Sequence, residues 1–350
     1  MKVAALLSGG VDSSVALHLL ARQRDVQVQA FYLKIWLEDE LAFLGDCPWE
    51  EDLRYARAVC QQLDIPLEVI PLQTEYRERI VEHALAELRA GRTPSPDIFC
   101  NERIKFGVFM DRLGGAFDRV ASGHYAQIAQ CEEGFCLQRA PDPVKDQTYF
   151  LSNLHQKQLA HLLFPIGHLP KLEVRTLAQT LAVPSKDRKD SQGICFLGKI
   201  NYRDFVAFHL GRKRGNLIER ETGEKKGEHE GYWFHTIGQR HGLGLGGGPW
   251  YVVDKDAESN TVFISHSDRQ DDRMRDRLTV SQLSWITGPP THAELQVKLR
   301  HGPQLIPCHF DYGAEGKGHL HLQQPDPGIA PGQHAVLYDG EYCLGGGIID

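Results

Sequence analysis

Hydrophobic residues in the first half of the chain fall into short runs that alternate with segments of helical periodicity. Apolar runs at residues 3–7, 26–33, 67–72 and 119–122 predict buried strands. Apolar positions at helical spacing predict helices from residue 11 and over residues 49–63 and 75–89, with a further helix over 102–113. Strands separated by helices indicate βαβ units, so we expect an α/β domain with a parallel, doubly wound sheet.

The pattern changes twice further along the chain. Between residues 187 and 239, Gly and charged residues are frequent, and residues 186–240 hold 12 Lys+Arg against 8 Asp+Glu. This predicts a small basic central domain. From residue 275 onward, alternating segments at 278–283, 293–299, 308–312 and 319–322 are separated by Gly and Pro turns, which predicts a C-terminal antiparallel β-barrel. We therefore expect domains at residues 1–200, 201–274 and 275–350.

Composition narrows the class of protein. The chain has 350 residues, of which 41% are hydrophobic and 24% charged, as in globular proteins of two or three domains. No apolar run reaches the ~18 residues needed to cross a bilayer, and Ser8 interrupts the only candidate secretory signal. A net charge of -7 argues against a nucleic-acid-binding surface that is basic throughout, but it is compatible with a local basic face. We expect a cytoplasmic protein without membrane contact.

The cysteines and histidines restrict the redox and metal chemistry. Eight cysteines without a C-x-x-C pair are too sparse for a disulfide scaffold, which favours a reducing compartment. None of the 17 histidines forms a convincing metal cluster with them, so we predict no structural metal. Cys131 and Cys136 are expected to lie in a hairpin as inert thiols.

A glycine-rich loop joins the first predicted strand to the first helix. Its residues are Leu7, Ser8, Gly9, Gly10, Val11, Asp12, Ser13 and Ser14. Two glycines allow a tight turn, and the following helix start offers free amides and its positive dipole end to an anion. The serines can donate hydroxyl hydrogen bonds to phosphate oxygens. Asp12 would repel a phosphate, so it is expected either to hold Mg²⁺ or to orient the loop.

This loop fits neither G-x-x-x-x-G-K-[ST] nor G-x-G-x-x-G. The pattern S-G-G-x-D-S-S resembles the PP-loop of ATP pyrophosphatases, which cleave ATP to AMP and pyrophosphate while adenylating an oxygen of the acceptor. The simplest alternative is a Gly-rich turn with a Ser cap.

Two cysteines stand in settings that favour a thiolate. Cys100 follows a loop fixed by prolines, and the pattern predicts a helix start just after it, with Arg103 close by. Asp97, three residues earlier, is suited to act as acid or base for a bound group. Cys195 follows a glycine in a segment with three basic residues, which stabilise a thiolate or the terminal sulfur of a persulfide. The plain alternatives are a half-buried structural cysteine at position 100 and, at position 195, a surface loop with an apolar plug of residues 194–196.

These segments together resemble the bacterial tRNA-specific 2-thiouridylase family along nearly the whole chain. The resemblance also covers the segments at residues 122–125, 145–151, 236–240, 331–333 and 337–340. Two departures from the family pattern are Leu33, where Met is usual, and His301, where Tyr is usual.

The resemblance implies a set of site residues. Residues 7–14, Leu33 and Gly123 would bind ATP; Cys100 would be the nucleophile, Cys195 the persulfide carrier and Asp97 the acid or base. Cys100 and Cys195 would form a transient disulfide. The remaining implied contacts, with the target base and with tRNA, are Ser95, Pro96, Asp97, Lys145, Asp146, Gln147, Arg300 and His301.

The implied reaction is sulfur transfer to C2 of the wobble uridine in tRNAs for Lys, Glu and Gln. ATP with Mg²⁺ would adenylate the C2 oxygen. A persulfide on Cys195, loaded by a cysteine desulfurase or a relay protein, would then supply sulfur. Cys100 would either release hydrosulfide from the persulfide or displace the sulfur directly, and the sequence leaves both routes open. Rival functions are a PP-loop ligase acting on a small molecule and a nucleotide-binding sensor without catalysis.

Overall fold

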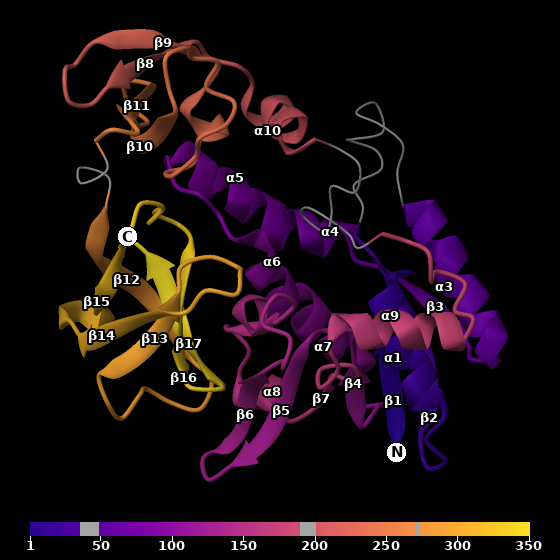
Figure 1. Ribbon diagram of the computed structural model, residues 1–350. Helices are drawn as coiled ribbons and strands as arrows, with labels where there is room; N and C mark the ends of the chain where they lie inside the picture. Colours follow the sequence, from indigo (N-terminus) through magenta and orange to yellow (C-terminus); the bar gives the residue numbers. More distant parts are fainter. Residues whose placement is uncertain (36–48, 190–200, 270–273) are drawn as a thin grey trace.

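The computed structural model describes residues 1–35, 49–189, 201–269 and 274–350. Figure 1 displays a sheet surrounded by helices at the N-terminus, a small central sheet at the top and a C-terminal barrel in yellow and orange. The predicted fold class is confirmed in all three parts. Within the described ranges, we find no helix with the length and apolar character needed to cross a membrane.

The N-terminal sheet is parallel, with strand order β3-β2-β1-β4-β7. Its strands are β1 (Lys2–Leu6), β2 (Gln27–Lys34), β3 (Leu67–Pro71), β4 (Arg119–Ala121) and β7 (Leu162–Leu163). The order reverses between β1 and β4, where successive connections leave to opposite sides. In open parallel sheets, ligands bind beyond the carboxyl ends of the strands at such a point.

Helices cover both faces of this sheet. One face carries α1 (Val11–Ala21), α3 (Trp49–Leu63) and α9 (Lys171–Thr180). The other carries α4 (Gln73–Tyr76), η2 (Arg77–Val81), α5 (Glu82–Arg89), α6 (Pro96–Phe99), η3 (Cys100–Val108) and α7 (Phe109–Leu113), with η4 (Thr148–Leu151) and α8 (Gln156–Leu159) beside them. Val3 and Ala5 pack with the first group and Ala4 with the second, because side chains alternate along a strand.

The helix that carries Cys100 begins earlier than the sequence pattern predicts. It starts with Pro96 and continues without a break through η3 and α7, instead of starting at residue 102. Proline at the first helical position is favourable, because the amide there has no intrahelical partner and the φ angle is already helical. Cys100 therefore lies in the second turn, and the expectation that it sits at a helix N-terminus is wrong.

The central region folds around a four-stranded sheet with order β10-β11-β8-β9. Its elements are α10 (Tyr202–Leu210), β8 (Gly215–Glu219), β9 (Lys225–His229), η5 (Tyr232–Phe234), β10 (Trp250–Asp256) and β11 (Thr261–His266). Leu217, Val252, Val262 and Ile264 form its own buried core.

The C-terminal strands close into a barrel through the pairing of β12 with β17. The barrel elements are β12 (Arg275–Trp285), β13 (Glu294–Lys298), β14 (Ile306–Tyr312), η6 (Ala314–Gly316), β15 (Gly318–Asp326), β16 (His334–Asp339) and β17 (Tyr342–Ile349). A hairpin of the N-terminal part, β5 (Ala126–Cys131) and β6 (Gly134–Arg139), extends the same sheet by pairing β6 with β17. The N-terminal part is thus joined to the barrel by backbone hydrogen bonds.

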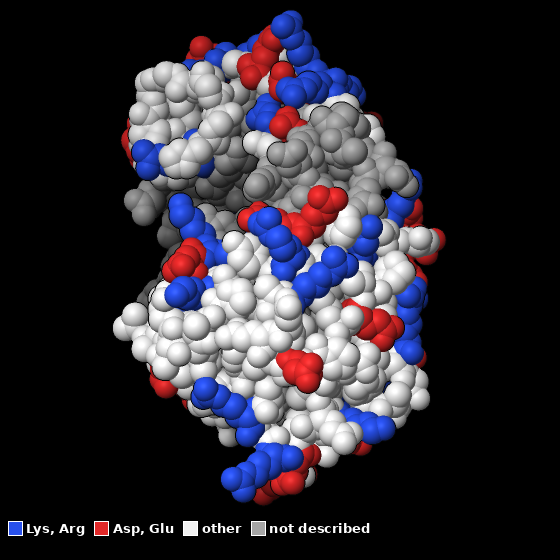
Figure 2. All heavy atoms as spheres, turned by 90° about the vertical axis from the view of Figure 1, so that its right-hand side faces the viewer, with Lys and Arg blue, Asp and Glu red and all other residues white. Residues whose placement is uncertain are grey.

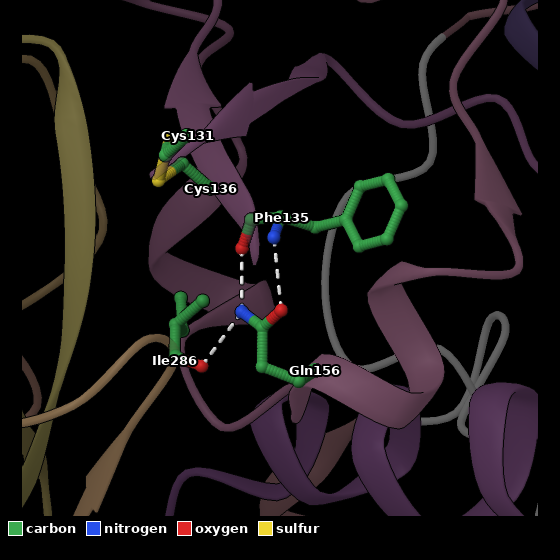
Figure 3. Close-up of a disulfide and its surroundings, with 5 residues drawn as sticks. All are labelled: Cys131, Phe135, Cys136, Gln156 and Ile286. Atoms are coloured by element: carbon green, nitrogen blue, oxygen red, sulfur yellow. Dashed lines mark hydrogen bonds between the residues drawn. A yellow bond between two sulfur atoms is a disulfide. The ribbon is translucent and has the colours of Figure 1, made fainter. Parts of the chain in front are cut away.

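The predicted hairpin is confirmed, but its cysteines are not free thiols. The turn brings the Cα atoms of Cys131 and Cys136 to 6.0 Å, within the range that a disulfide spans, and the two sulfurs are bonded. Figure 3 places this disulfide beside Gln156, whose side-chain amide bonds the N–H and C=O of Phe135 at 2.9 and 2.6 Å. The same amide donates to the C=O of Ile286 at 2.9 Å, so Gln156 fastens the hairpin to the segment after β12.

Candidate active site

The glycine-rich loop lies between β1 and α1, at the reversal of strand order. Gly9 has a φ of +76°, and a Cβ there would lie 2.2 Å from the carbonyl oxygen of Asp52. Only glycine therefore fits at this position. The loop leads into a helix of 11 residues whose first amides are unpaired within the helix, an arrangement that favours an anion.

The three serines of the loop have different environments. Ser8 is exposed and can face a ligand, with its Oγ 3.1 Å from Ser13 Oγ. Ser14 is fully buried; its hydroxyl donates to the carbonyl oxygen of Gly10 at 2.7 Å and lies 3.2 Å from Ser185 Oγ. The Ser14 side chain therefore supports the loop from within the protein, and it is not placed for a hydroxyl contact with phosphate.

The other predicted nucleotide residues converge on this loop. Gly123 follows β4, and a Cβ there would lie 2.7 Å from the backbone nitrogen of Ser13, so its backbone contacts the start of α1. Leu33 lies near the carboxyl end of β2, which pairs with β1. Leu7 and Val11 are buried in the core, so they hold the two ends of the loop by packing.

Asp12 is held by two side chains from distant parts of the chain. The Tyr125 hydroxyl donates to Asp12 Oδ1 at 2.8 Å. Lys171 Nζ donates to Oδ1 at 2.7 Å and to Oδ2 at 2.9 Å. Tyr125 therefore shapes the loop. The sequence motifs do not single out Lys171, because it lies 159 residues from Asp12 and outside any glycine-rich or cysteine-containing segment.

The segment that leads toward Cys195 also contacts the loop. Arg188 Nη1 donates to the carbonyl oxygen of Gly9 at 2.9 Å, and Nη2 bonds Asp52 Oδ1 at 2.6 Å. The guanidinium lies 4.7 Å from the centre of the Tyr55 ring. Cys195 itself falls outside the described residues, so its predicted role and its disulfide with Cys100 stay predictions.

Cys100 is buried, with 1% of its surface exposed. Its neighbours in sequence, Ser95 and Asp97, are half-buried at the start of the same helix. This helix reaches the nucleotide edge of the sheet, because the Phe106 ring lies 5.8 Å from the ring of His124, which follows β4. A persulfide from another segment would reach the Cys100 thiol only after the groups that cover it move.

Two imidazoles with lowered pKa values pack against Phe99, the residue before Cys100. The rings of His83 and His334 lie 4.6 and 5.2 Å from the Phe99 ring. Burial lowers the pKa of His334 to about 4, with the His83 and Arg103 charges acting in the same direction. Burial also lowers the pKa of His83. Both rings are therefore mainly neutral at pH 7 and add no positive charge of their own beside Phe99.

The predicted tRNA residue Asp146 occupies an unexpected position. Its carboxylate accepts a hydrogen bond from Lys298 Nζ at 2.7 Å, and both side chains are 0% exposed. Thr148 Oγ1 donates to the same carboxylate at 2.8 Å, and Arg139 Nε lies 3.4 Å away. This pair connects the N-terminal part to β13 of the barrel. Such burial conflicts with a side-chain contact to tRNA, whereas the neighbouring Lys145 is partly exposed.

The second pair of predicted tRNA residues lies close to the first group. His301 stacks on the Phe150 ring at 4.6 Å, and Phe150 is three residues beyond Gln147. Burial and the Lys298 charge lower the pKa of His301. Arg300 donates to Asp326 Oδ1 at 3.0 Å, and these side chains line a surface pocket with residues 301–304. The structure thus brings the regions around residues 147 and 301 together.

Basic side chains of the central region form ion pairs at the surface. The pairs are Arg203–Glu230, Arg212–Glu230, Arg214–Glu228, Lys225–Glu228 and Lys226–Glu224. Exposed pairs of this kind contribute little free energy, so the cations can exchange carboxylates for phosphates. Figure 2 displays acidic and basic residues mixed over the face that lies to the right in Figure 1, so positive charge is local and not general.

Three family profiles match successive parts of the chain. They are described as a tRNA methyl transferase HUP domain over residues 1–199, a tRNA methyl transferase PRC-barrel domain over 203–266 and an aminomethyltransferase beta-barrel domain over 275–349.

Curated relatives and solved structures resemble the chain to different extents. One similar solved structure is the U34-tRNA thiolase NcsA of Methanococcus maripaludis, at 18% identity and a TM-score of 0.36, covering 59% of this chain and 63% of that chain. The tRNA-specific 2-thiouridylase MnmA of Porphyromonas gingivalis is 44% identical over 360 residues, covering 100% of this chain and 99% of the relative. The MnmA 2 protein of Bacteroides fragilis is 46% identical over 356 residues, covering 100% of both chains. The protein belongs to the tRNA-specific 2-thiouridylase MnmA family.

Proposed function

We propose that this protein is a tRNA-uridine 2-sulfurtransferase that converts the wobble uridine to 2-thiouridine. The observation that carries the proposal is the full-length match to 2-thiouridylases at 44% and 46% identity. The loop at residues 7–14 lies at the reversal of strand order, and the helix bearing Cys100 places Phe106 5.8 Å from His124, which follows β4; both are features expected of such an enzyme. The proposed substrates are tRNAs for Lys, Glu and Gln.

ATP would bind along the loop, with its phosphates toward the amides at the start of α1. The close contacts of Gly9 and Gly123 with neighbouring backbone fit a loop that lets phosphate approach the main chain. The C2 oxygen of uracil would attack the α-phosphorus, pyrophosphate would leave, and the adenylated oxygen would become a good leaving group. This activation is needed because the free carbonyl oxygen leaves poorly.

The loop offers Mg²⁺ no unengaged carboxylate. Both oxygens of Asp12 accept hydrogen bonds from Lys171, and Oδ1 also accepts one from Tyr125. Among the residues that the structure describes, no group of three or more acidic, His or Cys side chains is arranged for a metal ion. Mg²⁺ would offset phosphate charge if it entered with ATP, and we assign no protein ligand to it.

Sulfur transfer would use the two predicted cysteines. A persulfide on Cys195, loaded by a cysteine desulfurase or a relay protein, would supply sulfane sulfur. In one route the Cys100 thiolate attacks the Cys195 sulfur, hydrosulfide leaves and then displaces AMP from C2. In the other, the terminal sulfur attacks C2 first and expels AMP; the Cys100 thiolate then attacks the Cys195 sulfur, which breaks the sulfur–sulfur bond and leaves the sulfur on C2. Both routes end in a Cys100–Cys195 disulfide, which a thiol reductant must reopen. Asp97 would exchange protons with the base.

The tRNA would be held mainly through its phosphates. The exposed basic side chains of the central region suit the backbone of the anticodon stem, and Lys145, Gln147, Arg300 and His301 would contact the RNA nearby. The target base must leave its stack, because C2 lies inside the ring. Ser95 and Pro96, at the start of the Cys100 helix, would then contact it.

Mass spectrometry of tRNA nucleosides after incubation with ATP, Mg²⁺, a sulfide source and reductant tests the proposal. We expect 2-thiouridine with the wild-type protein and, when a persulfide replaces free sulfide as the donor, none with Cys100→Ser. With persulfide as donor and no free sulfide, Cys195→Ser should also be inactive while still binding ATP. Cys60→Ala is the matched control, because burial raises the pKa of this thiol to about 11 and no role is assigned to it.

Pyrophosphate exchange into ATP separates the rival functions. The proposed enzyme exchanges label only when tRNA is present. Exchange that is independent of tRNA would indicate a small-molecule ligase, and ATP binding without any exchange would indicate a sensor. Either result would refute the proposed function.

A further inference from the structure

Lys171 brings a positive charge to the glycine-rich loop from α9, which packs on the same face of the sheet as α1. It is the first residue of α9, and its backbone N–H donates to Asp142 Oδ2 at 3.1 Å, which fixes the start of this helix. The side chain is only 13% exposed, and its ammonium lies against both oxygens of Asp12. The ammonium also lies 5.6 Å from the centre of the Tyr125 ring.

Asp12 alone would oppose the binding of a polyphosphate. It is the second residue of α1, inside the turn whose amides attract an anion, and its side chain is 30% exposed. Two like charges a few ångströms apart repel each other strongly even near a protein surface. An unpaired carboxylate here would therefore cancel much of what the helix start contributes.

The contacts of Asp12 favour a charge-balanced loop residue over a metal ligand. Its two oxygens accept three hydrogen bonds, two from an ammonium and one from the Tyr125 hydroxyl. Tyr125 is buried; its backbone N–H donates to Gln147 Oε1 at 2.9 Å, and its C=O accepts a hydrogen bond from the Gln147 N–H at 2.9 Å. A Mg²⁺ ion on this carboxylate would have to displace the lysine and would lie beside its positive charge.

We propose that Lys171 is a positioning residue of the ATP site, which acts by neutralising Asp12 and by holding its carboxylate toward α9. The assignment rests on the proposed ATP-dependent function and deepens it. It also decides between the two roles that the sequence leaves open for Asp12, in favour of orienting the loop.

Calorimetric titration of the full-length protein with ATP and Mg²⁺, without tRNA, tests the assignment in a double-mutant cycle. We expect Lys171→Met to weaken ATP binding at least tenfold and Lys171→Arg to remain within threefold of wild type. Asp12→Asn should bind ATP at least as tightly as wild type, because it removes a negative charge. Lys171→Met combined with Asp12→Asn should return to within threefold of wild type. Lys157→Met, on an exposed position of α8, is the control.

Each alternative gives a different pattern. Weaker ATP binding by Asp12→Asn would identify a metal ligand and overturn the assignment. If Lys171→Met weakens ATP binding equally in the wild-type and Asp12→Asn backgrounds, Lys171 acts independently of Asp12. This result would also overturn the assignment. If Lys171 is merely structural, Lys171→Met should lower the melting temperature, and adding Asp12→Asn should not restore ATP affinity. If wild type binds no ATP, the proposed function itself fails, which is distinct from any of these results.

Discussion

The buried pair of Asp146 and Lys298 gives a prediction that separates a structural role from RNA binding. Its partners lie 2.7 Å apart, and neither side chain has solvent exposure. Lys298→Met keeps most of the aliphatic stem but removes the ammonium. The carboxylate of Asp146 then remains buried with Arg139 at 3.4 Å and the Thr148 hydroxyl at 2.8 Å.

The structure sets the size of the expected effect. Removing one partner of a buried ion pair typically costs about 3–5 kcal/mol of unfolding free energy, because a charge is left without compensation. Arg139 still faces Asp146 after the substitution, so we expect the lower end, about 3 kcal/mol. The double variant Lys298→Met/Asp146→Asn removes the stranded charge and keeps an acceptor for Thr148. It should recover about 2 kcal/mol of that loss.

Urea unfolding followed by tryptophan fluorescence measures the effect, since Trp285 lies in the barrel strand β12. Binding of tRNA is measured in parallel under conditions where every variant is folded. Asp146→Asn should leave tRNA affinity unchanged. A loss of less than about 1 kcal/mol for Lys298→Met would refute the reasoning on burial. A tenfold loss of tRNA affinity in Asp146→Asn at unchanged stability would show that Asp146 contacts RNA after all.

Three further predictions concern the central region, the hairpin and pH. Replacing the exposed basic residues 212–214 by alanine should weaken tRNA binding and reduce its salt dependence by roughly one counterion per lost phosphate contact. The variant with Cys131→Ser and Cys136→Ser should lose at most about 2 kcal/mol of stability, because the disulfide closes a short loop that strand pairing already closes. Burial lowers the pKa of His235 to about 3. As pH falls, this imidazole is therefore protonated in the unfolded chain before it is protonated in the folded protein. The unfolding free energy should therefore fall as pH decreases from about 6.5 toward 3, and less so in His235→Leu.

These predictions have clear contrary outcomes. If the salt dependence of tRNA affinity is identical in wild type and in the 212–214 variant, these residues do not contact the RNA. Alkylation of Cys131 and Cys136 in the unreduced, folded protein would contradict the disulfide. A pH profile of unfolding that is unchanged by His235→Leu would mean that this imidazole does not titrate with folding.

Local patterns in the sequence determine much of this protein. The apolar runs of β1 and β2 and the periodicity of α3 mark elements at nearly the observed bounds, because strand and helix periods are local properties. The glycines of the loop can also be interpreted from the neighbouring residues alone, because a tight turn with a positive φ angle requires glycine. The helix of Cys100 was misplaced at its start because Pro96 serves equally well as a loop residue and as a first helical residue.

Only the tertiary structure decides which distant charges meet. Asp146 lies in a polar motif, yet its carboxylate is buried by Lys298, 152 residues away. Asp12 is paired with Lys171 of α9, a helix 159 residues further along the chain that packs on the same face of the sheet as α1. Neither pairing has a local signal, because Coulomb energies and desolvation depend on distance in space and not on separation along the chain.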